Sequence, residues 1–391
     1  MPSLVNHPRR QLIGALALAP FALAARSWAS PASQGEGRML VVLLRGGLDG
    51  LFAFSPSADP RWTSARPTLS RLALTQGLPL SGSGFVAHPA LPELAALYQA
   101  GELLFCPTAG TPDVSRSHFQ SQDVFELGNG QIMAASGFMA RLASALAGRP
   151  AASFSAGFPL CLSGSASLPM HIPLSQSGMR LNKGPALDAI LQAHAHLPSG
   201  VMLQQALDIQ RVLDSRDPDQ AARGAAPLSG WPALARQMGL LLRQQPDWAL
   251  SFIDLGGMDS HAAQATTLAG LLRQLSLGIQ ALKDSLGQEE WARTRLVVMS
   301  EFGRTVQENS SAGTDHGHGG LALLAGGGLG RPRMLGDFPG LQPAALFEGR
   351  DLPVLLDWRS LLAETARASF GLSERALDSV FPGRPRVAWT L

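Results

Sequence analysis

The sequence predicts an α/β protein in which a mostly parallel β-sheet is flanked by helices. Its main apolar runs are continuous and contain β-branched residues, a pattern typical of strands that are buried on both faces. Segments with helical spacing, among them residues 91–100 and 266–286, separate these runs. With 391 residues, of which 46% are hydrophobic, the chain can bury a large core.

The first apolar run, residues 39–44, leads directly into the segment RGGLDG. Its glycines allow the backbone to turn, and Asp49 follows the carboxyl end of the expected strand. Open α/β sheets bind their ligands at that edge, so Asp49 is a candidate metal ligand. An aspartate that only solvates a turn is the alternative.

The next apolar run, residues 102–107, is followed by the polar segment DVSRSHFQSQD, which is typical of a helix N-terminus. A helix dipole favours negative charge there, so Ser117 could act as a nucleophile if a cation lowers its pKa. The alternative is that Ser115 or Ser117 only caps the helix. We interpret His118 as a ligand, a substrate contact or a packed residue.

Two further apolar runs also end in potential metal ligands. Residues 248–254 precede the segment GGMDSH, in which Asp259 and His261 can reach one ion if the backbone is extended. Residues 296–299 lead into Glu301 and then into a glycine-rich segment, TDHGHGG. The candidates in that segment are Asp315, His316 and His318.

In a parallel sheet these strand ends share one edge, so we expect the acids, the imidazoles and the serine to converge. Such a set is suited to one or two divalent ions, which in a two-metal site lie about 4 Å apart. Zn, Mn, Mg and Ca all remain candidates, because carboxylates and imidazoles serve each of them in some combination. The pattern also leaves open whether His316 or His318 is the ligand.

Residues 1–29 indicate an export signal. The paired residues Arg9 and Arg10 precede an uncharged apolar run, and the segment SWA offers small residues for cleavage. The pattern resembles a twin-arginine signal, which is read by the export machinery for folded proteins, and a general secretory signal is the alternative. We therefore expect a periplasmic or secreted protein without a stable membrane anchor after cleavage, because the run is shorter than the roughly 20 residues that span a bilayer.

Charge and cysteine content argue against several other classes of protein. Removing residues 1–29 removes three arginines and no acid, which changes the formal net charge from +2 to −1. No run rich in lysine and arginine occurs elsewhere, so a nucleic-acid partner is not expected. Cys106 and Cys161 permit at most one disulfide, which is too few for a disulfide scaffold.

Taken together, these motifs resemble the DUF1501 family of exported bacterial proteins, placed in the alkaline phosphatase and sulfatase superfamily. The segments that carry the resemblance are LLRGGLDGL, SRSHFQSQDVFELG, DLGGMDSHAAQ, SEFGRTVQENSSAGTDHGHGG and the later DWR. The resemblance implies an alkaline-phosphatase-like, doubly wound sheet with metals at the strand ends. We expect one such domain over residues 38–391, with residues 130–245 as an inserted helical and loop region or a cap that covers the core.

The resemblance also implies roles for single residues. Those that match the superfamily's metal ligands and nucleophile are Asp49, Ser117, Asp259, His261, Glu301 and either His316 or His318. Phe302 departs from the pattern, because it stands where an Asp-His pair would supply a histidine to the second metal. That second site must recruit Asp315 or His316, hold its ion weakly, or be vacant.

The resulting functional hypothesis is an exported metal-dependent hydrolase of a phosphate or sulfate ester, with a small molecule or glycan as substrate. Ser117 would attack the ester in line, and Arg116 or Arg304 would balance the anionic oxygens, because a guanidinium group can bind two oxygens at once. A salt bridge that holds its loop is the alternative role of Arg304. The alternative function, which Phe302 favours, is a non-catalytic metal-containing binding or scaffold protein that retains the fold.

Overall fold

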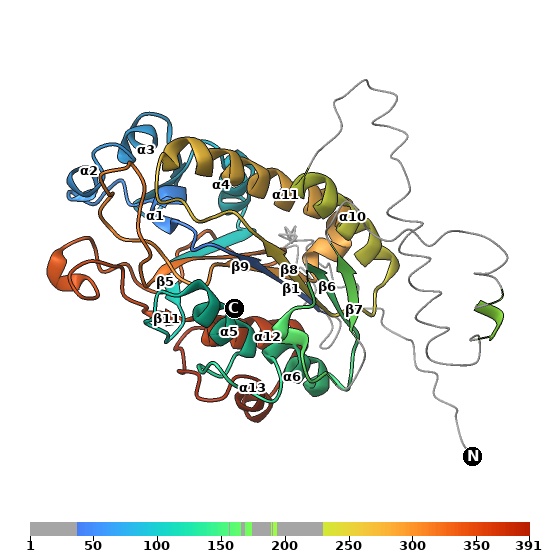
Figure 1. Ribbon diagram of the computed structural model, residues 1–391. Helices are drawn as coiled ribbons and strands as arrows, with labels where there is room; N and C mark the ends of the chain where they lie inside the picture. Colours follow the sequence, from blue (N-terminus) through green and yellow to red (C-terminus); the bar gives the residue numbers. More distant parts are fainter. Residues whose placement is uncertain (1–36, 156, 166–168, 174–188, 190, 194–229) are drawn as a thin grey trace, which may run out of the picture. The chain divides into compact units, whose positions relative to one another are not determined.

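The computed structural model describes residues 37–155, 157–165, 169–173, 189, 191–193 and 230–391 (Figure 1). In these residues eight strands form one sheet with the order β11-β5-β10-β9-β1-β8-β6-β7. The strands are β1 (Arg38–Leu44), β5 (Leu103–Gly110), β6 (Ala151–Ser155), β7 (Met170–Pro173), β8 (Leu250–Leu255), β9 (Thr294–Met299), β10 (Gly320–Gly326) and β11 (Leu356–Asp357). The predicted export signal, residues 1–29, lies outside the described residues.

Strand direction in this sheet agrees with the prediction. Among the described strands of this sheet, every pairing is parallel except the two that β10 makes, with β5 and with β9. Helices cover both faces (Figure 1). The predicted fold class, an α/β protein with a large, mostly parallel sheet flanked by helices, is therefore confirmed.

Strand β1 lies inside the sheet, between β8 and β9, and all seven of its residues are buried. Successive side chains of a strand point to opposite faces, and they enter two separate cores here. Leu40 and Val42 belong to one core, whereas Met39 and Val41 belong to the other. The double burial explains why this run is apolar without alternation.

The helices divide between these two cores. The core of Leu40 includes α4 (Pro92–Gln99), α10 (Trp231–Gln244) and α11 (Gln264–Ala292). The core of Met39 includes α5 (His118–Leu127), α6 (Phe138–Ala145), α12 (Trp358–Phe370) and α13 (Glu374–Val380). No helix in the described part of the chain is long and apolar enough to cross a bilayer.

Shorter elements lie in the connections between the larger ones. Three short strands form a small antiparallel sheet with the order β2-β4-β3 within the described residues. All the shorter elements together are α1 (Gly50–Ala53), β2 (Phe54–Ser55), α2 (Trp62–Ala65), α3 (Ser70–Gln76), β3 (Leu78–Leu80), β4 (Phe85–Ala87), η1 (Leu160–Leu162) and η2 (Pro343–Ala345). Cys106 and Cys161 are both buried and free.

The described parts of residues 130–245, the expected inserted region, belong to the main sheet and its helical layer. Strand β6 pairs in parallel with β8, and β7 pairs with β6. Helix α10 packs on α11 at Gly278, where a Cβ atom would come within 2.1 Å of Trp231 Nε1. These parts therefore extend the sheet instead of covering it, which differs from the expectation. The sequence could not reveal this, because strand pairing and close helix contact depend on partners far along the chain.

His88 is a buried histidine close to the small sheet. Its side chain is 2% exposed, its ring packs against Phe52, and its Nδ1 accepts a hydrogen bond from the backbone N–H of Ala90 at 3.1 Å. Its Nε2 has no hydrogen-bond partner in the described structure. Burial lowers the pKa of His88 from 6.5 to about 4, because the charged ring would lose its hydration.

We predict that His88 makes folding sensitive to acid. Because its folded-state pKa lies below the unfolded value, the unfolded chain takes up the proton first as the pH falls. Between pH 7 and 4 this should cost about 3 kcal/mol of the free energy of unfolding. The substitution His88→Asn, which keeps an acceptor but cannot take a proton, should remove that part of the pH dependence. Urea unfolding at both pH values measures the free energy of unfolding of the two proteins. An equal decrease between the two pH values in the parent protein and in His88→Asn would contradict the prediction.

Candidate metal centre

Strand ends bring several polar segments to one edge of the sheet. Strands β1, β8 and β9 are parallel neighbours, and β5 shares their direction because both β5 and β9 are antiparallel to β10. The loop after β8 carries Asp259 and His261, and the segment after β9 carries His316. Helix α5, which follows β5, begins at His118.

Three imidazole rings surround the carboxylate group of Asp259. Its Oδ1 lies 3.0 Å from Nε2 of His261 and 3.4 Å from Nε2 of His316. Its Oδ2 lies 3.5 Å from Nε2 of His118. The Nε2 atoms of His261 and His316 are only 3.1 Å apart. We call these four residues the imidazole cluster.

Each ring of the imidazole cluster is held from its opposite side, at Nδ1. The partners are Glu301 Oε1 for His118 at 2.7 Å, Asp315 Oδ1 for His261 at 3.1 Å, and the carbonyl oxygen of Arg116 for His316 at 2.9 Å. A carboxylate or carbonyl oxygen only accepts hydrogen bonds, so each Nδ1 carries the proton and donates it. Metal-binding histidines are oriented in the same way, which leaves Nε2 free to bind the metal.

The donor atoms of the imidazole cluster fit a divalent cation. With Nδ1 protonated, the Nε2 lone pairs of His261 and His316 face each other at 3.1 Å, which is repulsive unless a proton or a cation lies between them. Nε2 of His118 is buried and has no hydrogen-bond partner in the described structure. One ligand atom each from His118, Asp259 and His316 lie within 4.8 Å of one another. Imidazole nitrogens with a carboxylate oxygen suit zinc and similar ions.

Arg304 holds Asp259 from outside the imidazole cluster. Its buried guanidinium group donates to the carboxylate of Asp259 and to the carbonyl oxygens of Gly46, Gly47 and Thr314. Burial raises the pKa of Asp259, but the hydrogen bond and the charge of Arg304 outweigh this effect and lower the pKa. These contacts agree with the alternative role of Arg304, a salt bridge that holds its loop.

The carboxylate group of Glu301 is buried and fully used within the protein. Its Oε1 accepts hydrogen bonds from His118, Gln122 and the backbone N–H of Gly46, and its Oε2 accepts one from Ser300 at 3.0 Å. Burial raises the pKa of Glu301, but the hydrogen bonds from His118, from Gln122 and from backbone N–H groups outweigh burial and lower the pKa to about 2. In this arrangement Glu301 orients His118, and its predicted role as a direct metal ligand stays a prediction.

Gly46 allows the turn after β1 to reach both Glu301 and Asp259. Its φ angle is +112°, a value that residues with a side chain rarely adopt. A Cβ atom at this position would also come within 2.5 Å of the backbone nitrogen of Asp259. Gly46 is therefore required both for the turn and for the close approach of the Asp259 backbone.

Asp49 contacts other partners than the histidines. Its side chain is 1% exposed, and its Oδ2 accepts hydrogen bonds from Arg66 at 2.5 Å and from Gln264 at 2.6 Å. Its Oδ1 caps α1 by accepting from the backbone N–H of Phe52 at 3.1 Å. In this arrangement Asp49 forms a buried ion pair with Arg66, and its role as a metal ligand stays a prediction.

His318 and the guanidinium group of Arg116 also have partners outside the imidazole cluster. The ring of His318 lies 4.5 Å from that of Phe347, and burial lowers the pKa of His318. Arg116 donates to Oδ2 of Asp351 from Nε at 3.0 Å and from Nη2 at 2.8 Å. Of the two histidines that the sequence leaves open, the structure places His316 in the cluster and His318 beside Phe347.

Ser117 is the N-cap residue of α5 and directly precedes His118. Its side chain makes no capping hydrogen bond, although its backbone is extended as in a cap. Ser115 instead donates to Asp113 at 2.6 Å and accepts from the backbone N–H of Ser117 at 3.2 Å. Ser115 is therefore used to form the turn, and the nucleophilic role of Ser117 stays a prediction.

Phe302 forms an apolar wall of the imidazole cluster. Its ring centroid lies 4.9 Å from that of His118 and 4.8 Å from that of His316. The side chain is 4% exposed, so it fills space beside the two rings without offering a ligand atom. On this side the cluster is closed by a hydrocarbon surface.

The sequence leaves the role of His118 open, whereas the structure groups it with the candidate ligands. The sequence also indicates this grouping. Asp259 and Glu301 are marked by their positions after strand ends, and α5 likewise begins after the end of β5. The spacing of His118 and Gln122 points the same way, since residues four apart share a face of a helix. Both of these side chains contact Glu301.

The fold and the imidazole cluster define an α/β protein with a candidate metal centre at the carboxyl edge of its sheet. A family model described as "Protein of unknown function (DUF1501)" matches residues 86–381. The chain belongs to the DUF1501 family, as its motifs predict. Among curated proteins no relative of the chain is detected.

Three solved structures illustrate what the chain is similar to. The lipoteichoic acid synthase LtaP from Listeria monocytogenes is 9% identical, with a TM-score of 0.42 over 87% of this chain and 73% of that one. The C-terminal periplasmic domain of EcEptC from Escherichia coli is 12% identical, with a TM-score of 0.40 over 91% and 89%. A protein in the alkaline phosphatase superfamily from Vibrio parahaemolyticus is 12% identical, with a TM-score of 0.35 over 77% and 62%. At this level of similarity the three structures carry no argument about the activity of this chain.

We predict that Asp49 stabilises the fold independently of metal. The substitution Asp49→Ala leaves Arg66 buried without its partner, which should lower the free energy of unfolding by about 3–5 kcal/mol. Urea unfolding with and without excess EDTA should give the same loss. Asp123→Ala, which removes an exposed carboxylate from α5, is the control and should stay within about 0.5 kcal/mol. A loss that appears only when metal is bound would identify Asp49 as a ligand instead.

Proposed function

We propose that the chain is an exported metal-dependent hydrolase of a phosphate or sulfate ester, with the imidazole cluster as its metal centre. The observation that carries the proposal is the convergence of three Nε2 atoms on Asp259, with every Nδ1 fixed by an acceptor. The position of the cluster supports it, because open α/β sheets bind ligands at the carboxyl ends of their strands. A divalent cation there supplies Lewis acidity to an ester oxygen and makes a nearby hydroxyl group more acidic.

The residues around the imidazole cluster would keep its ligand atoms in place. Glu301 and Asp315 accept hydrogen bonds from His118 and His261, which fixes the tautomer of each ring and makes its Nε2 a better electron donor. Arg304 keeps the carboxylate of Asp259 ionised and directed inward. These three side chains, those of Glu301, Asp315 and Arg304, act on the ligands and need not touch the substrate.

Ser117 is the residue that we propose as the nucleophile. It directly precedes His118, and its hydroxyl group is not used to cap α5. In the proposed reaction the serine oxygen attacks phosphorus or sulfur, and the serine proton passes to the departing alcohol. Water then cleaves the serine ester and releases phosphate or sulfate. The guanidinium group of Arg116 is engaged by Asp351, so it is not assigned to the anionic oxygens.

Export is part of the same proposal. It is supported by the paired arginines and the apolar run within residues 1–29, which resemble a twin-arginine signal. The machinery that exports folded proteins is accordingly the proposed partner, and the periplasm or the exterior is the proposed location. A protein exported in the folded state can acquire its metal before it crosses the membrane.

A non-catalytic metal-binding protein is the second candidate, and Phe302 favours it. The ring packs against His118 and His316 and supplies no ligand for a second ion. Within the described residues, His118, Asp259 and His316 are the group found whose atoms could hold a metal. A single ion in a partly closed site could serve binding or stability alone, so metal content and turnover must both be measured.

We predict that the protein binds about one divalent ion and that His316, not His318, contributes to the site. Elemental analysis should give one equivalent, and bound Co²⁺ should show the visible absorption of a site with imidazole ligands. His118→Ala and His316→Ala should weaken binding at least tenfold, because each removes a candidate ligand. His318→Ala is the matched control and should retain the ion. Two equivalents, or the reverse ranking of the two histidines, would refute this assignment.

We also predict metal-dependent turnover that requires Ser117. Hydrolysis of 4-nitrophenyl phosphate and sulfate should appear with one of Zn, Mn, Mg or Ca and vanish with EDTA. Ser117→Ala should lower kcat by about a thousandfold or more, whereas Ser115→Ala should retain most of it. Unchanged turnover in Ser117→Ala would remove the nucleophile from the mechanism. A protein that binds metal but cleaves neither ester would belong to the second candidate function.

A further inference from the structure

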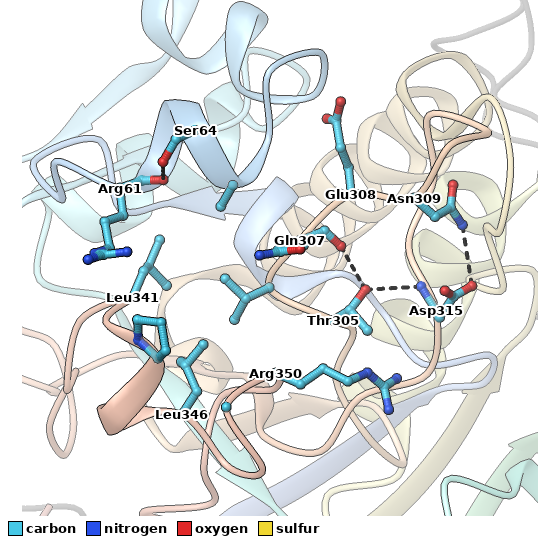
Figure 2. A pocket seen from close by; sticks show the side chains of 14 residues that line it. Arg61, Ser64, Thr305, Gln307, Glu308, Asn309, Asp315, Leu341, Leu346 and Arg350 are labelled. Atoms are coloured by element: carbon cyan, nitrogen blue, oxygen red, sulfur yellow. Dashed lines mark hydrogen bonds between the residues drawn. The ribbon is translucent and has the colours of Figure 1, made fainter.

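A surface pocket of about 350 Å³ lies next to the imidazole cluster (Figure 2). Three segments contribute to it, within residues 61–65, 305–309 and 341–350, and Asp315 also lines it. Its volume is at the lower end of the roughly 300–1,000 Å³ that is typical of ligand-binding pockets. The proposed function does not yet assign it a role.

Two residues of this pocket also contact the imidazole cluster. Oδ1 of Asp315 lies 3.1 Å from Nδ1 of His261, and Arg350 donates to the carbonyl oxygen of His316 at 2.5 Å. The positive charge of Arg350 also helps to lower the pKa of Asp315. The pocket and the cluster therefore share a wall, to which Asp315 and the backbone of His316 contribute.

The carboxylate groups that line the pocket are engaged by the protein. Glu308 accepts hydrogen bonds from the backbone N–H groups of residues 68 and 69 at 2.8–3.1 Å. In Figure 2 its side chain extends away from Arg350. Asp315 accepts from His261 at 3.1 Å and from Asn309 at 3.3 Å. Their negative charges are thus partly balanced by donors that are already in place.

The arginine side chains of the pocket have donors to spare. The guanidinium group of Arg61 has no hydrogen bond or ion pair within the described residues, and the side chain is exposed. Arg350 uses Nη2 on His316 and has Nε at 3.5 Å from Asp351, while its Nη1 has no partner in the described structure. Planar guanidinium groups bind carboxylate, phosphate and sulfate through paired hydrogen bonds.

We propose that this pocket binds a second anionic group of the substrate, so that the preferred esters carry a further sulfate, phosphate or carboxylate group. The proposal rests on the proposed function, because it places the reacting ester at the imidazole cluster and the second group at the guanidinium group of Arg61, across the pocket from that of Arg350 (Figure 2). The side chains of Leu341 and Leu346, which also line the pocket, contact the carbon skeleton between the two groups. Esters with a single anionic group would use only half of this site.

Inorganic sulfate tests the pocket without relying on turnover. Calorimetric titration of the purified full-length protein, at low ionic strength and with EDTA, should show saturable sulfate binding. Arg61→Gln should weaken it about tenfold, because it removes one charge-assisted pair of hydrogen bonds. Arg71→Gln is the matched control, since it removes an exposed arginine of α3 outside the pocket, and it should bind sulfate as the parent protein does.

Several outcomes would overturn the proposal. The first is that the parent protein does not bind sulfate. The second is that Arg61→Gln and Arg71→Gln lose the same affinity for sulfate, and the third is that the protein prefers the cation spermidine. The result is independent of the hydrolase assay. Intact sulfate binding without ester turnover supports the anion pocket and removes the hydrolase, whereas turnover without sulfate binding removes the pocket and keeps the hydrolase.

Discussion

The candidate metal centre depends on one buried carboxylate group, that of Glu301. Burying a charge is costly unless donors replace its hydration. Here the donors come from separate parts of the chain, namely the turn after β1 through Gly46, helix α5 through His118 and Gln122, and Ser300 at the end of β9. Each donor satisfies the charge and is thereby fixed in place. The hydrogen bond by which His118 helps to replace the hydration of this charge also directs Nε2 of His118 toward Asp259.

Strand direction explains why so many polar residues gather at this edge. Strand β10 is antiparallel to β9, so the connection between them begins and ends at the carboxyl edge of the sheet. Glu301, Asp315 and His316 all lie on this connection and are therefore held at that edge. A bridge between Arg304 and His316 folds it back on itself. One reversed strand in a parallel sheet thus keeps a whole segment beside the site.

Much of this arrangement follows from sequence, and the remainder follows from partners that are distant in the chain. Continuous apolar runs predict the buried strands, and the strand-end argument selects Asp259, His261 and His316, which the structure places together. The same argument selects Asp49, but its environment is decided by Arg66 and Gln264, which no local pattern connects to it. Glu301 shows the same limit, because an acid after a strand can bind a metal directly or hold the histidine that does. Only the tertiary contacts separate these roles.

The charges around the imidazole cluster bear on both the proposed metal and the proposed anionic substrate. Three carboxylates, those of Asp259, Glu301 and Asp315, contact the rings, and the guanidinium group of Arg304 contacts one of them. Because Arg350 also acts on the charge of Asp315, the three carboxylates and two guanidinium groups leave one excess negative charge when the rings are neutral. A divalent cation in the cluster offsets the excess locally, as bound ions commonly dominate the field of a site. Under the proposed function, the acids that orient the histidines would therefore also favour a bound cation where the anionic ester is expected.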